Sequence, residues 1–549
     1  MPTEAVGARG SAFAGTWALV RLALRRDRVV MPAWVAGIAG LLVVSVASVV
    51  GLYDSEAARA QYAAVAAASP VARAFDGPMA GTSLGAITMT ETFGILAILA
   101  SVMSIQAVVR HTRREEETGR RELIGSAVVG RHAPLTAGLA VAFSANLLLG
   151  VGAAVTLRAH ALPLQGSVIA AVALAAVGCV FAAVTAVTAQ ASETARGATG
   201  LAAGVLGLAF LLRAVGDAAG EVAASGVDVV SAWPSWLSPI GWGQQVRPFD
   251  ADHWWLLGLH LALAGVLVAT AFFMAARRDL GAGLMAVRPG APSASRWLRS
   301  PFALAVRLQR GAGAAWAVGL IVLAAVFGAI GEEADTLLQT SDELAAALAA
   351  LGPDGSLVDA YFAFMAAFVA VAAAGFTVQS VLRARGEEQA GRAEPLLVTP
   401  VSRSRWLLGH VACAAGGTVA ILAVAGASAG LAYGVASGEW DAVGSIVVAS
   451  SVHVPAALAL GGFVVATVAA IPRWAVAVSW VALAGSLVMG QLGALLDLPQ
   501  WLLNISPFTH VPAVPAADVA VLPLLWLLVA AVSLTVLGLV WFRRRDVPL

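Results

Sequence analysis

Residues 114–123 read REEETGRREL, and residues 386–395 read GEEQAGRAEP, 272 positions later in a chain of 549 residues. Each stretch is a charged island between two long apolar runs, and half of its positions recur in the other. The matched pairs are Glu115/Glu387, Glu116/Glu388, Gly119/Gly391, Arg120/Arg392 and Glu122/Glu394. Because an internal match at nearly half the chain length indicates a duplicated domain rather than a short repeat, we expect two similar halves.

The composition is that of an integral membrane protein. Hydrophobic residues make up 60% of the chain and charged residues 12%, whereas soluble domains are roughly 45–50% apolar. Runs of about 20 apolar residues, long enough to cross a bilayer, recur throughout. In so apolar a chain we expect the two islands to lie in water. The net charge of +1 indicates no nucleic-acid partner.

We predict an all-α fold with about twelve transmembrane helices, arranged as two parallel six-helix repeats. The expected spans are 29–51, 88–109, 135–157, 167–188, 198–212 and 254–276, then 314–330, 360–382, 406–435, 443–471, 475–496 and 519–542. The predicted domains are an N-terminal segment with an amphipathic surface (elbow) helix at 1–28, the first half at 29–276, a linker with a second elbow helix at 277–312, the second half at 313–542 and a tail at 543–549.

The arginines predict the orientation. The chain has 33 basic residues besides histidine, and every one is arginine. With both islands, the linker and both termini on one side, all but five arginines lie there; the exceptions are Arg59, Arg73, Arg158, Arg213 and Arg247. Positive residues accumulate on the cytoplasmic side, so we expect the islands and termini to be cytoplasmic. The loops opposite are expected to hold acids such as Asp217 and Asp228.

Several classes of chemistry are excluded or disfavoured. Without lysine the chain cannot contain the GxxxxGK[ST] phosphate-binding loop. No histidine or cysteine spacing matches a metal site, so we expect no metal, no catalytic residue and no cofactor in this chain. A membrane enzyme or assembly scaffold stays as an alternative without a motif to support it.

If the islands are helical, Glu116 and Arg120 form a favourable i,i+4 pair, as do Glu388 and Arg392. An acidic helix in which a glycine leaves room for close approach is suited to dock another protein. The alternative interpretation is that each island is a solvated loop. Pro395 stands where the first island has Leu123, so we expect the second island helix to end sooner.

Three further features repeat or stand out. Trp233, Ser238 and Pro239 align with Trp501, Ser506 and Pro507 ahead of the last span of each half. The sequence Arg-Arg-Asp follows both last spans, at 277–279 and 544–546. Glu91 is a carboxylate close to the apolar body of the second span. It either lines a substrate path or is an acid near the helix start facing outer water.

The paired E-E-x-x-G-R-x-E islands, the run from Ser238 to Phe249 and the run from Arg277 to Leu284 resemble ATP-binding-cassette (ABC) exporter permeases. The similarity is to type-2 permeases with two fused halves, such as actinobacterial tetronasin, polyketide-antibiotic and multidrug exporters. It implies a permease in the bacterial plasma membrane that exports amphiphilic small molecules. The islands would be its coupling helices, and the Trp-Ser-Pro segments its re-entrant elements. ATP and magnesium would bind to two partner ATPase subunits.

A secondary, ion-coupled efflux carrier with twelve helices is the alternative. Such carriers also place a Gly-Arg-Arg-like motif between the second and third spans, which Gly119, Arg120 and Arg121 match superficially. Ion coupling requires ionisable residues in mid-span, and few are expected here.

Overall fold

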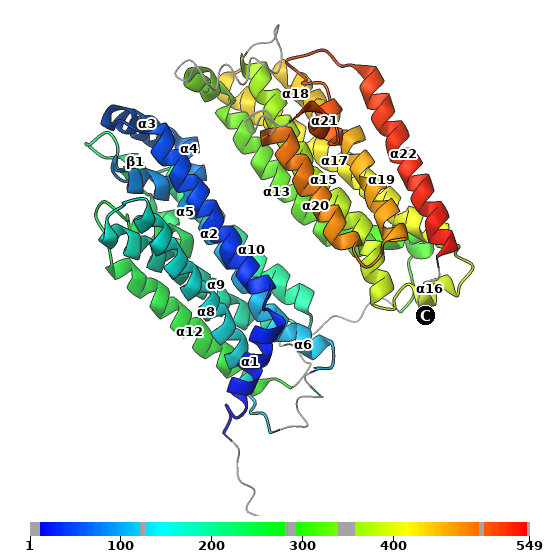
Figure 1. Cartoon of the computed structure of the whole chain (residues 1–549), viewed down its shortest axis with the longest axis horizontal. Helices are drawn as coiled ribbons and strands as arrows, with labels where there is room; N and C mark the ends of the chain where they lie inside the picture. The colour runs from blue at the N-terminus through cyan, green and yellow to red at the C-terminus, as the bar shows by residue number, and fades with distance from the viewer. Residues whose placement is uncertain are drawn as a thin grey trace, which may run out of the picture. The chain divides into compact units, whose positions relative to one another are not determined.

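The computed structural model describes residues 11–120, 122, 128–279, 283, 292–338, 357–492 and 499–545. The chain divides into two compact units, Met1–Pro289 and Gly290–Leu549. Arg121 and Leu123 of the first island, the distal end of the predicted eleventh span, and Asp546 lie outside the described residues. Each unit is a bundle of long helices (Figure 1).

The first unit is helical apart from one short antiparallel hairpin, in which Glu221 pairs with Val230. Its elements are α1 (Thr16–Arg26), α2 (Val30–Leu52), α3 (Glu56–Ala68), α4 (Pro70–Phe75), α5 (Leu84–His111), α6 (Arg113–Glu117), α8 (Ala133–Ala159), α9 (Leu164–Ala191), α10 (Ala195–Ala218), β1 (Glu221–Val222), β2 (Val229–Val230), the 3₁₀ helix η1 (Trp233–Leu237), α11 (Pro239–Gln245) and α12 (Trp255–Arg277).

The second unit follows the same plan of long spans and short connecting helices. Its elements are the 3₁₀ helix η2 (Arg296–Arg299), α13 (Pro301–Leu338), α15 (Leu357–Gln389), α16 (Glu394–Leu397), α17 (Arg403–Ser437), α18 (Ala442–Ser451), α19 (Val454–Ala470), α20 (Ala475–Leu487), the π-helical turn η3 (Val488–Leu492), α21 (Gln500–Leu503), the 3₁₀ helix η4 (Pro507–His510) and α22 (Val521–Arg544).

The predicted fold class is confirmed: within the described ranges, eleven helical stretches are long and apolar enough to cross a bilayer. The tenth of these, Ala442–Ala470, comprises α18 and α19, which are separated near His453 just before Pro455. The predicted eleventh span corresponds to α20, whose apolar helical stretch, Ala475–Gly490, is shorter than the others. The fifth span, α10, is 24 residues long and extends beyond the range expected from sequence.

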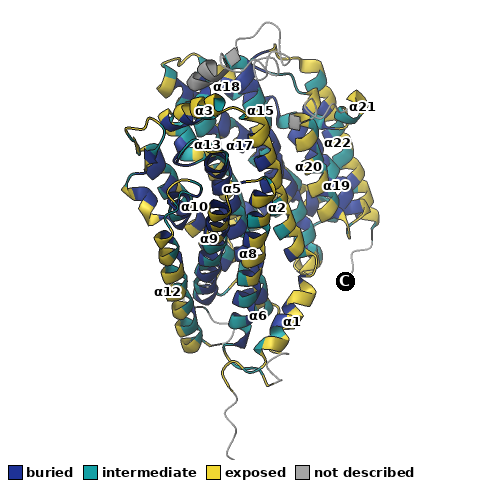
Figure 2. Ribbon diagram, turned by 60° about the vertical axis from the view of Figure 1, so that its left-hand side comes forward, coloured by how far each residue is buried: buried dark blue, intermediate teal, exposed yellow. Residues whose placement is uncertain are grey.

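Two spans form the centre of each unit. In the first unit the apolar windows of α5 and α9 are 72% and 67% buried, against 22% for α2 and 17% for α12. In the second unit the α15 and α18–α19 windows are 72% and 78% buried, against 17% for α22. Figure 2 shows the exposed residues along α2 and α12. The second and fourth spans of each half are therefore the scaffold on which the other spans pack.

Side-chain caps define where several spans begin. Ser83, Thr194 and Ser402 each precede a helix in extended conformation. Each hydroxyl accepts a hydrogen bond from a backbone N–H in the first turn. Such caps satisfy donors that otherwise lack a partner at a helix start.

A buried polar network lies at one end of the first unit, where we expect charged residues at the surface. Arg213 and Asp217 were expected at the outer surface, but both belong to α10 and both side chains are fully buried, 3.6 Å apart. Arg213 also donates to the backbone of Ala74 and Phe75 and to Gln244. A buried charge is tolerated only with such partners, so this pair fastens α4 and α11 to the fifth span.

The two units differ at the start of their first spans. In the first unit α1 ends at Arg26, with Asp27 as its C-cap residue, and α2 begins at Val30. In the second unit α13 begins at Pro301 and continues without interruption to Leu338. The residues expected to form a second elbow helix are thus the first turns of α13.

Candidate functional site: a charge clamp repeated in both units

The first island, with Arg113 immediately before it, is held by a cluster of side chains that we call the first charge clamp: Arg113, Glu116, Arg131 and Arg278. Arg131 is exposed, and the side chains of the other three are buried. Arg278 binds the Glu116 carboxylate through its two terminal guanidinium nitrogens, with Nη2–Oε1 at 2.7 Å and Nη1–Oε2 at 2.9 Å. Arg113 Nη1 lies 2.6 Å from Glu116 Oε2. The side chains of Arg113, Glu116 and Arg278 are 0%, 3% and 6% exposed. Burial lowers the pKa of Arg278.

The clamp connects the island to three spans. Arg113 Nε donates to Ala189 O near the end of α9, at 3.1 Å. Arg278 follows α12 directly and also donates to Gln190 Oε1 of α9, at 2.6 Å. Arg131, two residues before α8, donates to Arg278 O at 2.8 Å. The ends of the fourth and sixth spans and the start of the third therefore meet at Glu116.

The second island, with Arg385 immediately before it, has the same arrangement in a second charge clamp: Arg385, Glu388, Arg403 and Arg545. Arg385 Nη1 lies 2.9 Å from Glu388 Oε2, and Arg545 Nη2 binds Glu388 Oε1. Arg403, at the start of α17, donates to Arg545 O at 2.8 Å. Arg545 Nη1 donates to Val468 O near the end of α19, at 2.7 Å. The clamp thus joins equivalent spans in both units.

The sequence pattern pointed to Glu116 and Glu388. It did not point to the arginines immediately before the islands or to those at the starts of the third spans. The signal was present, because Arg113 and Arg385 are separated by the same 272 positions, as are Arg131 and Arg403. Arg278 and Arg545 were noticed only as parts of a repeated Arg-Arg-Asp run. Their contact with the islands depends on tertiary packing.

The expected i,i+4 pairs do not form. Arg120 Nη1 instead lies 3.6 Å from Glu115 Oε1, and Arg392 Nε lies 2.7 Å from Glu387 Oε2. The reason is that the helix stops before the arginine. Gly119 and Gly391 adopt φ of 69° and 68°, a left-handed conformation that ends a helix and turns the chain back.

The expectation for Pro395 was also wrong. The island helices end at Glu117 in α6 and at Gln389 in α15, which are equivalent positions two residues before the glycine. Pro395 lies in the first turn of α16 and so starts a helix instead of ending one. The two island helices therefore stop at the same place.

The islands are only partly in water, which corrects a further expectation. The side chains of Glu387 and Glu388 are 7% and 4% exposed, as buried as Glu116. Each island does have an exposed tip, which we define as the residues at and after the glycine turn. Arg120 and Glu122 are exposed in the first tip; Gly391, Arg392 and Glu394 are exposed in the second.

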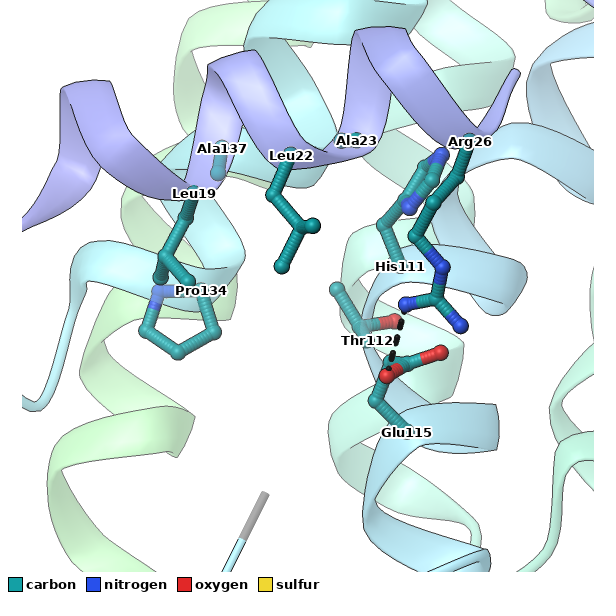
Figure 3. Close-up of a pocket in the computed structure, with 9 residues that line it drawn as sticks. All are labelled: Leu19, Leu22, Ala23, Arg26, His111, Thr112, Glu115, Pro134 and Ala137. Carbon is teal, nitrogen blue, oxygen red and sulfur yellow. Dashed lines mark ion pairs between the residues drawn. The ribbon is translucent and has the colours of Figure 1, made fainter. Parts of the chain in front are cut away.

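The carboxylate next to the clamp is held differently in the two units. Glu115 Oε2 lies 3.0 Å from Arg26 Nη1, at the end of α1. Glu387 Oε1 lies 2.6 Å from Arg383 Nη2, one turn earlier on the same helix. Figure 3 shows Arg26 and Glu115 facing each other beside a cavity lined by Leu19 and Leu22 of α1 and Pro134 of α8. Among the described residues, this ion pair to a separate surface helix is seen at the first island.

Glu91 lies in the second turn of α5, at the opposite end from the island. The Tyr53 hydroxyl, at the end of α2, donates a long hydrogen bond of 3.5 Å to Glu91 Oε1. Burial and the neighbouring Glu91 carboxylate raise the pKa of Tyr53, which keeps the phenol protonated. Burial, reinforced by Glu91 and opposed by Arg213, raises the pKa of Asp76 to about 7. Two carboxyl groups and two phenols, those of Tyr53 and Tyr62, therefore gather at this end of α5.

The aligned Trp-Ser-Pro segments form similar local structures. Ser238 accepts from Gly241 N to cap α11, and Ser506 accepts from Phe508 N to cap η4. Pro239 and Pro507 lie in the first turns of these helices. Trp233 and Trp501 are 72% and 68% exposed, as expected of aromatic residues at a membrane boundary. Their re-entrant character stays a prediction.

Among the described residues, no group of three or more histidine, cysteine or acidic residues is placed to hold a metal ion. The site is therefore a set of ion pairs that fix helices, with two small charged tips at the surface.

A duplicated bundle of apolar spans, with its charged islands clamped to span ends, is the architecture of a multi-pass membrane protein. Residues 298–543 match the family model described as "Multidrug efflux system permease Rv1217c, C-terminal domain". Over 541 residues the chain is 42% identical to the multidrug efflux system permease protein Rv1217c of Mycobacterium tuberculosis (strain ATCC 25618 / H37Rv), covering 98% of this chain and 96% of that protein. The chain belongs to this family of multidrug efflux system permeases.

Proposed function

We propose that this chain is the membrane-spanning subunit of an ATP-driven exporter of amphiphilic small molecules, including drugs. The relative's name supports multidrug efflux by a permease. The chain has no lysine and hence no phosphate-binding loop of the usual kind. Energy would therefore come from separate ABC ATPase subunits, with ATP and magnesium bound there.

The observation that carries this proposal is the repeated charge clamp. Each clamp joins an island to the ends of the fourth and sixth spans and the start of the third. A buried network of this kind is stiff, because breaking one partner leaves an unpaired charge. A displacement of the exposed tip would consequently move several spans together. Each clamped island would thus act as a lever on the spans joined to it. Two such levers suit a pair of ATPase subunits, one for each island.

In this proposal the residues of each island have different roles. Glu116 and Glu388 would hold each clamp together without reaching the ATPase. Glu115 and Glu387 support the arginine that follows the glycine turn. Arg120 and Arg392, with side chains 56% and 58% exposed, are presented to the ATPase.

Glu122 and Glu394 complete the exposed tips. With Gly119 and Gly391 forming the turns, each tip presents one basic and one acidic side chain. The tips and both chain termini would lie on the cytoplasmic side of the bacterial plasma membrane, as the distribution of arginines indicates.

The test uses the purified full chain with and without a candidate ABC ATPase subunit. We expect no ATP hydrolysis by the chain alone and transport-coupled hydrolysis with the subunit. The double variant Arg120→Glu with Arg392→Glu should lower drug-stimulated hydrolysis and efflux at least tenfold, since reversing interface charges costs about 2 kcal/mol or more. Arg299→Glu, an exposed change in η2, is the matched control.

Hydrolysis by the chain alone would refute the partner requirement. Efflux that persists without any ATPase subunit and follows the proton gradient would instead support the ion-coupled carrier. Unchanged efflux in the double variant would remove the tips from the coupling surface.

We also propose that Glu91 lies on the substrate path. Its position on α5 beside Tyr53 combines a carboxylate with an aromatic ring, which favours cationic amphiphiles. Glu91→Gln keeps the shape and removes the charge, so it should reduce export of cationic drugs more than of neutral ones. An equal effect on both drug types would make Glu91 an ordinary acid near the outer end of α5.

A further inference from the structure

The amphipathic helix α1 has a basic face that its own unit leaves uncovered. Val20 and Ala23 are buried against the bundle, whereas Arg21 and Arg25 of the helix, and Arg28 two residues after its end, are exposed. Trp17 is 62% exposed, and the Arg21 guanidinium lies 5.0 Å from its ring centroid. Arginine and tryptophan on one exposed helix face are typical of contact with a phospholipid surface.

The position of α1 brings this face to a membrane boundary. Only residues 27–29 separate α1 from α2, a 23-residue apolar span with no charged residue. A helix that ends so close to a span must lie near the lipid headgroups. Because the exposed side chains are cationic, the complementary occupant is an anionic phospholipid.

The opposite side of α1 is tied to the first island by two consecutive residues. Arg26 Nη1 lies 3.0 Å from Glu115 Oε2 (Figure 3). Asp27, 1% exposed, binds His111 Nε2 at 2.5 Å and Arg110 Nη1 at 2.8 Å. His111 is the last residue of α5 and lies two residues before α6. A shift of α1 is therefore transmitted directly to the island.

The start of α1 is fixed to the same region. Gly130 N donates to Ala14 O and His132 N donates to Ala12 O, both at 2.9 Å. Residues 12–14 thus pair with the segment that leads into α8. Both ends of α1 are therefore attached to the region that contains the island and the start of the third span.

In the part of the second unit that the structure describes, no such connection is present. Glu387, the equivalent of Glu115, is paired with Arg383 and Arg392, both from its own segment. No break separates an elbow helix from the first span, because α13 is continuous from Pro301. The link between a surface helix and an island is a property of the first unit.

We propose that anionic phospholipid headgroups bind Arg21, Arg25 and Arg28, and that this contact stabilises the first island through Arg26 and Asp27. Lipid charge would then set how firmly one of the two levers is held, while the other is indifferent to it. The lipid contact stands independently; only its effect on transport rests on the proposed function.

The test measures amide hydrogen exchange of the full chain in nanodiscs, without any ATPase subunit. One preparation contains phosphatidylcholine alone and the other includes phosphatidylglycerol. A surface arginine contributes roughly a fivefold factor to attraction by an anionic membrane, and three contribute on the order of a hundredfold at low salt. We expect phosphatidylglycerol to slow exchange in residues 16–26 and 113–120 at least about fivefold, with no change in residues 385–394.

Two variants separate binding from transmission. Arg21→Ala with Arg25→Ala and Arg28→Ala should abolish both responses, whereas three exposed arginines of the second unit are the charge-matched control: Arg296→Ala, Arg299→Ala and Arg405→Ala. Arg26→Gln keeps the basic face and breaks the pair with Glu115. It should preserve the response of residues 16–26 and reduce that of residues 113–120 by a factor of about three.

Equal exchange in both lipid mixtures, or a response that survives the triple substitution, would overturn lipid binding. A full response at residues 113–120 in Arg26→Gln would overturn transmission through Arg26. None of these outcomes depends on transport, so a failed efflux assay leaves them interpretable.

Discussion

Replacing Glu116 by alanine should destabilise the first island far more than its location outside the apolar spans suggests. The substitution removes three close contacts, at 2.6, 2.7 and 2.9 Å, from two guanidinium groups. Arg113 and Arg278 are then left with side chains only 0% and 6% exposed. Breaking a buried ion pair by removing one partner costs roughly 3–5 kcal/mol.

Amide hydrogen exchange of residues 113–120, in detergent or nanodiscs, measures this cost directly. If local opening governs exchange, a loss of 3–5 kcal/mol speeds it by about two to three and a half orders of magnitude. Glu122→Ala, an exposed change in the same island, should alter it by less than about threefold. Glu388→Ala should reproduce the large effect in the second unit.

Exchange in Glu116→Ala that matches Glu122→Ala would show that the clamp holds nothing. A second check replaces the whole group by apolar residues: Arg113→Met, Glu116→Leu and Arg278→Met together should recover most of the lost stability, because well-packed apolar side chains often substitute for a buried triad at little cost. Such a variant would keep the island folded and test whether charge itself is required for efflux.

Three further outcomes are expected. Gly119→Ala should destabilise the glycine turn by roughly 1–2 kcal/mol in exchange measurements, since φ is 69° there and nothing crowds an added methyl group; Gly119→Asn should be milder. The pKa of Asp76 is raised from 3.8 to about 7, so the folded state binds its proton more tightly; stability should fall as pH rises from about 4 to 7, and Asp76→Asn should flatten that slope in thermal unfolding. Arg213→Ala should cost about 3–5 kcal/mol by stranding Asp217, whereas Arg213→Met with Asp217→Leu should cost much less in denaturation assays.

Sequence alone determined the class of protein and its duplication. Apolar runs of bilayer length are set by local composition, and a bilayer admits few structures other than helices for such runs. The islands were found because their residues recur at one offset, which requires no knowledge of packing. The sequence showed that Gly119 and Gly391 recur, but it did not show that they end the helix, since that effect depends on backbone conformation.

Tertiary structure decided which charges meet. Within an isolated helix Glu116 has Arg120 as its favourable neighbour, yet its partners are Arg113 and the distant Arg278. The left-handed turn at Gly119 removes the local pairing, and the packing of α9 and α12 supplies a buried alternative that water would not provide. Ion pairs formed between segments 162 residues apart follow from how helices pack, which periodicity and spacing do not encode.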